Sequence, residues 1–246
     1  ENLSDQQAVG QHIRLPAHPL GTDQLGRDMF ARILEGARTS LFVGIVAPLL
    51  FIFFGTVYGA LAGLLGGVWD DLMMRFADFV VGLPLLLFMI LFRVLFGFEA
   101  GDSGVTAIIV AMLLLSWPSS ARLVRGQVLQ MREQPFVQSA RLSGASNLYL
   151  IRHHLVPNLL PLLLVSLSFA IPQAIFTEAF LSFIGLGVSP PTASWGSLCN
   201  EGIKTLLTHP HELVFPALMI SITVLAFNSL GESLRDAVDV KGRDNV

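Results

Sequence analysis

The sequence predicts an all-α protein that crosses a membrane several times, and three observations support this fold class. Hydrophobic residues make up 53% of the 246-residue chain and charged residues only 13%, whereas about a quarter of an ordinary soluble domain is charged. The mean hydropathy is +0.66. Five apolar runs approach or exceed the roughly 20 residues that a helix needs to cross a bilayer. They cover residues 41–66, 79–98, 105–121, 155–184 and 213–230.

The first 40 residues are mixed in charge and contain no apolar run, so we expect them to lie outside the membrane. Turn and cap residues between Gly21 and Asp28 lead into an amphipathic helix that begins at Met29. We expect this helix to lie in the outer interface, which separates residues 1–40 from a membrane domain over residues 41–246. Because the chain begins with Glu1 rather than methionine, we expect a further span upstream.

The distribution of basic residues orients the spans. Residues 122–152 contain five arginines and one acid, Glu133, and loops rich in arginine and lysine face the cytoplasm. Alternation across five spans then places residues 1–40 and 185–212 on the outer side of the membrane. It places the tail after Gly231 on the cytoplasmic side.

The first span carries glycine at every fourth position, namely at Gly55, Gly59, Gly63 and Gly67. Small residues at this spacing lie on one face of a helix and let a second backbone approach closely, which is how helices associate in lipid. We interpret the row as a packing seam within this chain, and a seam between two chains is the alternative.

A short cytoplasmic helix is predicted between Pro135 and Ser143. Proline is suited to the first turn of a helix, and Gly144 is suited to a left-handed stop after about two turns. A second helix is predicted to begin near Ser146, which suits an N-cap, and to run towards Pro157. Two helices of this kind fit either a docking element for another protein or a segment that lies on the membrane surface.

Residues that break helices precede an outer tryptophan between the last two spans. Gly185, Gly187, Pro190 and Pro191 forbid a continuous helix. Trp195 is a residue type that sits at the level of the lipid headgroups. We therefore expect residues 185–212 to form a re-entrant or surface segment, which is tolerated only where protein or water satisfies its backbone.

Arg93 and Glu178 are the charged residues inside the apolar runs. A charge in the middle of a bilayer costs about 2.5 kcal/mol or more, so such residues are functional candidates. Arg93 lies near a helix end, where its side chain can extend to the interface. Glu178 fits either a hydrogen-bonding role at an outer gate or a contact on a transport path.

The sequence also excludes several kinds of site. A single cysteine, Cys199, excludes a disulfide within the chain. His153 and His154 have no carboxylate or cysteine at metal-ligand spacing, so we expect no bound metal. The phosphate-binding pattern GxxxxGK[ST] is absent, and we expect this chain neither to bind nor to hydrolyse ATP by itself. No nucleic-acid partner is expected.

The cytoplasmic segment REQPFVQSARLSGASNLYLIRHHLVPN, residues 132–158, resembles the EAA loop of ABC importer permeases. In that family a short coupling helix in this loop docks on the cytoplasmic ATPase. Gln138, Ser139, Ala140 and Gly144 fall on the E, A, A and G of the motif, and Pro157 falls on its closing proline. Glutamine replaces the family's glutamate and serine its first alanine, so an ion pair made by that glutamate is not expected here.

Three further blocks resemble the second permease subunit of the dipeptide, oligopeptide and nickel importers. HPLGTDQLGRDMFARILEGAR at residues 18–38 is similar to the family's GTDxxGRD block. EAFLSFIGLGVSPPTASWG at 178–196 is similar to its outer block, and FNSLGESLRDAVD at 227–239 to its C-terminal signature. Together with the coupling loop over residues 122–157, these blocks cover nearly the whole chain in the family's order.

The resemblance implies the type I ABC importer permease fold, in a multi-pass protein of the bacterial inner membrane that imports peptides or a related solute such as a nickel chelate. It implies a homologous second permease, two ATPases that hold ATP and magnesium, and an outer substrate-binding protein as partners. No enzymatic activity or cofactor of its own is expected. Phe136 and Arg141 should contact the ATPase beside the motif residues, and Glu178, Phe183 and Trp195 are candidates for the outer gate or the pathway.

Two other classes of membrane protein fit the sequence less well. An ion-coupled secondary transporter needs coupling residues in mid-span, and only Arg93 and Glu178 are available. An intramembrane hydrolase needs a nucleophile and a base that face one cavity. Ser166 and Ser168 lie too far along their span from the two histidines to form an obvious pair.

Overall fold

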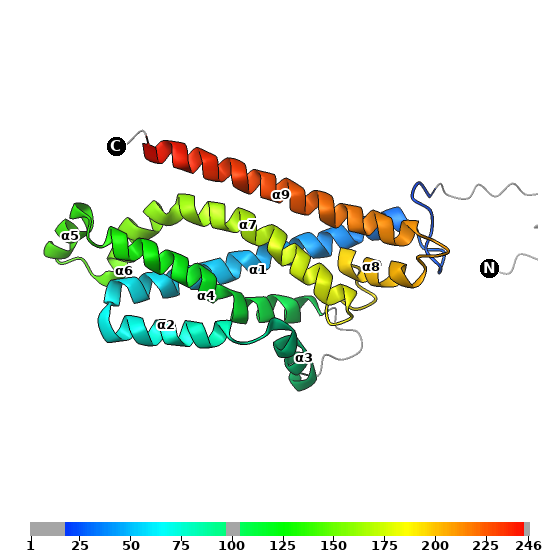
Figure 1. Cartoon of the computed structure of the whole chain (residues 1–246), viewed down its shortest axis with the longest axis horizontal. Helices are drawn as coiled ribbons and strands as arrows, with labels where there is room; N and C mark the ends of the chain where they lie inside the picture. Colours follow the sequence, from blue (N-terminus) through cyan, green and yellow to red (C-terminus); the bar gives the residue numbers. More distant parts are fainter. Residues whose placement is uncertain (1–17, 97–103, 244–246) are drawn as a thin grey trace, which may run out of the picture.

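The computed structural model describes residues 18–96 and 104–243, with side chains at 18–92 and 104–238, and over these residues the protein is a bundle of helices (Figure 1). The elements in chain order are α1 (Met29–Leu65), α2 (Gly67–Val81), α3 (Leu85–Phe96), α4 (Val105–Met131), α5 (Pro135–Leu142), α6 (Asn147–Leu150), the π-helix η1 (Ile151–Leu155), α7 (Val156–Phe183), α8 (Trp195–Lys204) and α9 (His211–Arg243).

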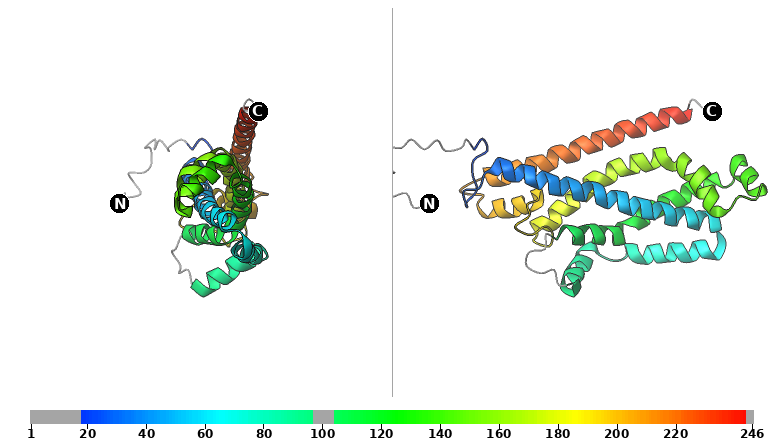
Figure 2. Two further views of the ribbon diagram at one scale, coloured as in Figure 1. Left: turned by 90° about the vertical axis from the view of Figure 1, so that its left-hand side faces the viewer. Right: turned by 180° about the vertical axis from the view of Figure 1, so that it is seen from behind.

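Among the described residues, four stretches of helix are long and apolar enough to cross a membrane: Met29–Leu65, Val105–Met131, Asn147–Phe183 and His211–Val238. They run along the long axis of the molecule (Figures 1 and 2). Helices α5 and α6 project from one end, here called the α5 end, and α8 lies at the other, the α8 end. The sequence prediction of an all-helical protein with several spans is therefore confirmed.

The predicted span over residues 79–98 is wrong as a single helix. The structure has α2 and α3 in its place, bent by 78° at a short break. Pro84 explains the break, because proline has no N–H to donate and disfavours helical backbone at the residue before it. Leu83 instead donates its N–H to the carbonyl of Val80 at 3.1 Å, which closes a turn. The pair α2 and α3 counts as a fifth crossing only if it spans as a broken helix.

The predicted boundaries of two other spans are also wrong. Helix α1 runs without a break from Met29 to Leu65, so the amphipathic helix expected in the outer interface forms the first turns of the span itself. Helix α4 continues through Pro118 to Met131, ten residues beyond the predicted end at Ala121. Prolines are tolerated in membrane helices because neighbouring groups satisfy the freed backbone. The first ten residues of the segment predicted to be cytoplasmic, 122–131, are therefore helical and continue α4.

The glycine row lies mainly against α4. A Cβ atom on Gly55 would lie 2.6 Å from the carbonyl oxygen of Trp117, and one on Gly59 would overlap the backbone of Ala121. A Cβ on Gly63 would lie 2.9 Å from Cγ1 of Val128. These three glycines let α1 and α4 of the same chain meet at backbone distance.

Gly67 does not belong to this seam, contrary to the prediction. A Cβ there would meet nothing within 4 Å, and its φ is +57°. Gly66 before it has a φ of +64°. The two glycines instead form the turn between α1 and α2, because L side chains rarely adopt this backbone conformation.

Candidate functional site

The loop at the α5 end has the two short helices that the sequence predicted. Pro135 is the first residue of α5, and the helix ends at Leu142, one residue before the predicted end. Gly144 follows with a φ of +84°, and its N–H donates to the carbonyl of Arg141 at 2.9 Å. The side chain of Ser146 accepts the N–H of Tyr149 at 3.3 Å and caps α6. The stop and the cap explain why the chain reverses here.

Helix α5 has an inner face that packs on the bundle and an outer face that is open. Val137 is fully buried and joins a core cluster with residues of α1, α4 and α7, and Ala140 packs against the same cluster. The side chains of Phe136, Gln138 and Ser139 are exposed on the other side.

Leu142 and Leu148 extend this open surface, and the sequence reasoning missed both. They are 90% and 73% exposed at the tip of the molecule. We call Phe136, Leu142 and Leu148 the tip patch. The sequence could have indicated this patch, because Leu142 and Leu148 are apolar residues on either side of the Gly144 turn. A turn exposed only to water usually carries polar residues at such positions.

Arg141, predicted to contact a partner protein, is exposed and also contacts its own chain. Its Nη2 donates to the carbonyl of Leu64 at 3.4 Å, and Nη1 of Arg132 donates to the carbonyl of Gly63 at 3.2 Å. The last carbonyls of a helix have no partner within that helix, and cations are favoured near them. Two arginines from the loop therefore cap the end of α1.

Aromatic and histidine rings join the two helices of the loop to the start of α7. The ring of His153 stacks on Tyr149 with centroids 4.3 Å apart, and the ring of His154 lies 6.2 Å from that of Phe136. Both histidines belong to the π-helix η1, a form that occurs frequently at functional sites. Pro157, the closing residue of the predicted motif, is the second residue of α7. Among the described residues, no group of three or more metal-ligating side chains could hold an ion.

An open cavity of about 510 Å³ lies about midway along the bundle, bounded by α1, α2, α4, α7 and the break before α3, and we call it the central cavity. None of its lining residues carries a charge. Its polar groups are the hydroxyls and the amide of Ser116, Ser119, Ser120, Ser166, Gln173 and Thr177. The sequence reasoning did not identify this site, although serines at positions 116, 119 and 120 form a polar stripe of helical spacing in an apolar helix.

The three residues predicted to lie at an outer gate or on a pathway do not line that cavity. Glu178 is fully buried where α1, α7 and α8 meet. Trp195, expected at headgroup level, is 1% exposed, and its indole Nε1 donates to the carbonyl of Ile33 at 3.1 Å. Phe183 is the last residue of α7, and its carbonyl accepts the side-chain amide of Asn200 in α8. The side chain of Arg93 lies outside the described residues.

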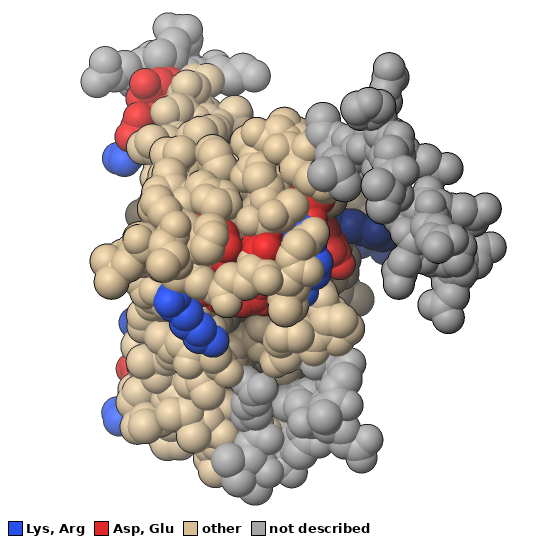
Figure 3. All heavy atoms as spheres, turned by 90° about the vertical axis from the view of Figure 1, so that its right-hand side faces the viewer, with Lys and Arg blue, Asp and Glu red and all other residues tan. Residues whose placement is uncertain are grey.

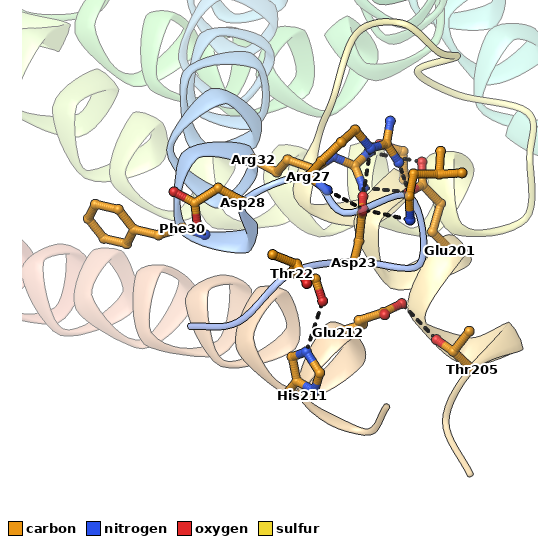
Figure 4. A network of polar contacts seen from close by, with 12 residues as sticks. Thr22, Asp23, Arg27, Asp28, Phe30, Arg32, Glu201, Thr205, His211 and Glu212 are labelled. Carbon is orange, nitrogen blue, oxygen red and sulfur yellow. Dashed lines mark hydrogen bonds and ion pairs between the residues drawn. The ribbon is translucent and has the colours of Figure 1, made fainter. Parts of the chain in front are cut away.

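Charged residues gather at the α8 end of the molecule (Figure 3). Arg32 places Nη1 2.5 Å and Nη2 3.0 Å from the two carboxylate oxygens of Glu201, and its Nη1 also lies 3.0 Å from Asp23. Arg27 bridges the same two acids at 2.6 and 3.2 Å (Figure 4). This ion-pair ring joins the segment before α1 and the first turn of α1 to α8. The sequence shows the arginines interleaved with Asp23 but not their partner Glu201, which is 169 positions from Arg32.

The pKa of Asp23 lies below its ordinary value. Burial raises the pKa, but hydrogen bonds from the backbone N–H groups of Arg27 and Leu25 and from the Arg27 guanidinium more than offset it. The carboxylate of Asp23 is therefore held in its charged form.

Comparison with known proteins identifies similar sequences and similar folds. The family described as "Binding-protein-dependent transport system inner membrane component" matches residues 55–243. The dipeptide transport system permease protein DppC of Bacillus subtilis is 46% identical over 92% of this chain and 69% of its own length. The oligopeptide permease OppC of the same species is 44% identical over 92% of this chain and 72% of its own length. The glutathione permease GsiD of Escherichia coli O6:K15:H31 is 42% identical over 91% of this chain and 72% of its own.

Two solved structures resemble the fold. The inward-facing MetNI methionine ABC transporter superposes with a TM-score of 0.66 at 18% identity, covering 85% of this chain and 97% of that chain. An amino acid ABC transporter gives a TM-score of 0.58 at 17% identity, covering 85% of this chain and 94% of that chain. At these identities the likeness shows the shared fold.

Proposed function

This chain belongs to the family of binding-protein-dependent transport system inner membrane components, and from that premise we propose that it is a permease subunit of an ATP-driven peptide importer in the bacterial inner membrane. In this proposal it pairs with a homologous second permease, two cytoplasmic ATPases and an outer substrate-binding protein. The chain is not itself catalytic, and ATP and magnesium are held by the ATPase subunits.

The observation that carries the proposal is the loop at the α5 end. Its two short helices project from the bundle and expose the tip patch, with Leu142 90% exposed. An apolar patch at a polar end of a membrane protein favours contact with another protein. The family's coupling motif falls on Gln138, Ser139, Ala140 and Gly144. We expect the ATPase to bind α5, which carries the first three of these residues.

The contacts of Arg132 and Arg141 support a route for movement from the loop into the spans. Both side chains hold the last carbonyls of α1. Helix α1 in turn packs on α4 through its glycines, at backbone distance. A displacement of α5 by the ATPases would therefore be passed to α1 and α4 together, because tightly packed helices move as a unit. These helices bound the central cavity, which we propose is this subunit's share of the pathway.

The lining of the cavity supports peptides as the substrate class. The relatives are named for dipeptides, oligopeptides and glutathione, all of which contain peptide bonds. The backbone of a peptide offers N–H donors and C=O acceptors. In the cavity, serine, threonine and glutamine side chains can form the hydrogen bonds that these groups form with water outside. A lining without formal charge favours neither acidic nor basic side chains, which suits a pathway for peptides of varied sequence.

Co-purification with ATPase subunits tests the proposal. We expect Leu142→Asp to release the ATPases from the detergent-extracted complex and to abolish peptide uptake, because it places a charge in the docking surface. Leu207→Asp is the matched control, since Leu207 is 98% exposed at the opposite end of the molecule. It should leave both the ATPases and the uptake unchanged. Failure of the unsubstituted protein to retain any nucleotide-binding subunit would refute the proposal.

Energy coupling separates this function from the ion-coupled alternative. In reconstituted vesicles, peptide uptake should require ATP on the side of the α5 end. It should persist when a protonophore and a sodium ionophore remove the ion gradients. Uptake driven by an ion gradient without ATP would favour a secondary transporter.

A further inference from the structure

We propose that Glu178 is a positioning residue that holds the segment from residue 185 to α8 against α1 and α7 and thereby closes the central cavity towards the α8 end. The packing part of this inference is independent of the proposed function. Its consequence for transport rests on that function.

The carboxylate of Glu178 is bound by hydroxyl groups from two helices. Oε2 accepts the hydroxyl of Ser40 of α1 at 2.7 Å, and Oε1 accepts the hydroxyl of Ser182, one turn further along α7, at 2.7 Å. The side chain is fully buried. Among the described side chains, no basic residue forms an ion pair with it. Burial of a carboxylate without a cation is costly, so these hydrogen bonds are essential to its place in the fold.

Backbone N–H groups fix the direction of both hydrogen bonds. Ser40 Oγ accepts the N–H of Trp195 at 3.1 Å, and Ser182 Oγ accepts the N–H of Val188 at 2.9 Å. Each hydroxyl therefore receives one hydrogen bond from the stretch between residue 185 and α8 and donates its own hydrogen to Glu178. Such chains of hydrogen bonds reinforce one another in a low-dielectric interior.

The same arrangement presents the start of α8 to the carboxylate. Trp195 is the first residue of α8, and the N-cap Ser194 forms a reciprocal capping box with Ser197. The N-terminal end of a helix carries a partial positive charge. Glu178 thus lies beside the end of α8 that favours an anion, while Glu201 holds the body of α8 through the ion-pair ring (Figure 4).

Val188 links this network to the cavity. Its N–H is held by Ser182, and its side chain is buried in an apolar cluster with Met112 and Ala174. Met112 and Ala174 also line the central cavity. The cluster also contains Met89 of α3 and residues from turns of α1, α4 and α7 that lie nearer the α8 end, including Val43, Ile108 and Leu181. The cluster therefore covers the cavity on that side, and the Glu178 network seats Val188 in it.

The native cysteine provides a direct test. Cys199 lies in α8 and is buried, and burial together with the nearby charge of Glu178 raises the pKa of its thiol to about 11. We would measure its labelling rate by a membrane-impermeant maleimide in the intact complex. Because loss of Glu178 also lowers the pKa of the thiol, the rate is measured at several pH values and expressed per thiolate. For Glu178→Ala we expect this rate to rise about tenfold or more, because loss of a buried hydrogen-bonded carboxyl group frees α8 to open locally. Glu178→Gln keeps one acceptor oxygen and should give a smaller increase.

Two controls separate a local effect from general destabilisation. Glu35→Ala removes an exposed carboxylate of α1 and should leave the labelling rate unchanged. Gly59→Ala disturbs the packing of α1 on α4 far from α8 and should also leave it unchanged at the same temperature. A labelling rate in Glu178→Ala that equals the unsubstituted rate, or that rises no more than in Gly59→Ala, would overturn the inference.

Transport supplies a second readout that a merely structural role would not change. Glu178→Ala should retain its ATPase subunits but hydrolyse several times more ATP per peptide imported, because the cavity no longer closes at the α8 end. An unchanged ratio of ATP to peptide with fast Cys199 labelling would reject the closing role. If the unsubstituted complex proved to contain no ATPase, the proposed function would fail, while the labelling result would still decide the packing role of Glu178.

Discussion

The guanidinium group of Arg125 donates two hydrogen bonds to the carboxylate of Asp70, with Nε 2.5 Å from Oδ1 and Nη2 2.6 Å from Oδ2. The pair joins α4 to α2, 55 positions apart in the chain, and the side chain of Asp70 is only 8% exposed. Bidentate geometry of this kind is the strongest that an arginine offers a carboxylate.

Removal of one partner should therefore destabilise the protein. Asp70→Asn leaves the Arg125 charge without its carboxylate, and we expect a loss of about 2 kcal/mol in the free energy of unfolding. The neighbouring pair of Arg122 and Asp78 is a matched control, because its side chains are 45% and 63% exposed. Asp78→Asn should cost less than about 0.5 kcal/mol. Melting temperatures in detergent would measure both, and equal shifts would contradict the burial argument.

The seam between α1 and α4 predicts a contrast between two glycines. Gly59→Ala forces a methyl group into the backbone of Ala121, which should cost about 1–3 kcal/mol through overpacking. Gly126→Ala adds the same methyl group to α4 where nothing lies within 4 Å, and it should be neutral or slightly stabilising. Thermal unfolding and the yield of the permease pair in detergent would measure the difference. Normal assembly of Gly59→Ala with a defect in transport alone would contradict a packing role.

The left-handed turn at Gly144 predicts a loss of coupling without loss of the spans. Proline would fix φ near −65°, where the structure has +84°, and would remove the N–H that bonds to Arg141. We expect Gly144→Pro to abolish peptide-stimulated ATP hydrolysis while the melting temperature stays nearly unchanged. Gly26→Pro is the control, because Gly26 has a φ of +74° in an open turn at the α8 end. Full stimulation in the Gly144 variant would count against the role of this loop.

Cysteine labelling tests which end of the molecule faces the cytoplasm. Leu142→Cys and Leu207→Cys place a thiol at the two ends of the bundle on strongly exposed positions. An impermeant maleimide added to intact cells should label Leu207→Cys only, and one added to inverted vesicles should label Leu142→Cys only. Native Cys199 contributes little background at neutral pH because it is buried with a raised pKa. The reverse pattern would invert the orientation predicted from the arginines.

The lowered pKa of Asp23 predicts a pH dependence at the α8 end. A carboxyl group with a depressed pKa in the folded state contributes stability above its unfolded pKa, here 3.8, and loses that contribution as the pH falls through the folded value. The melting temperature of Asp23→Asn should thus lie below that of the unsubstituted protein from pH 7 to about pH 5, and the gap should narrow below about pH 4. Asp71→Asn, at an exposed position of α2, should show no such convergence. A difference in melting temperature that is constant with pH would show that the charge of Asp23 does not contribute to stability.

Local features of this chain could be predicted because their causes lie within a few residues. Pro135, Gly144 and Ser146 act on the backbone beside them, so the loop with its stop and cap follows from the sequence. Four of the five predicted crossings follow from the length and hydropathy of the apolar runs in the described residues, since a bilayer imposes about 20 apolar residues on any spanning helix. The run over residues 79–98 misled because Pro84 breaks it.

The partners of the charged and aromatic residues were decided only by the tertiary structure. Glu178 meets Ser40 across 138 positions, and Trp195 meets the carbonyl of Ile33 across 162. Arg141 and Arg132 cap α1 because the carbonyls of Leu64 and Gly63, at the end of that helix, lie beside them. The composition and spacing of the sequence show that a charged residue in an apolar run needs a polar partner. Which residue becomes that partner depends on how the helices cross.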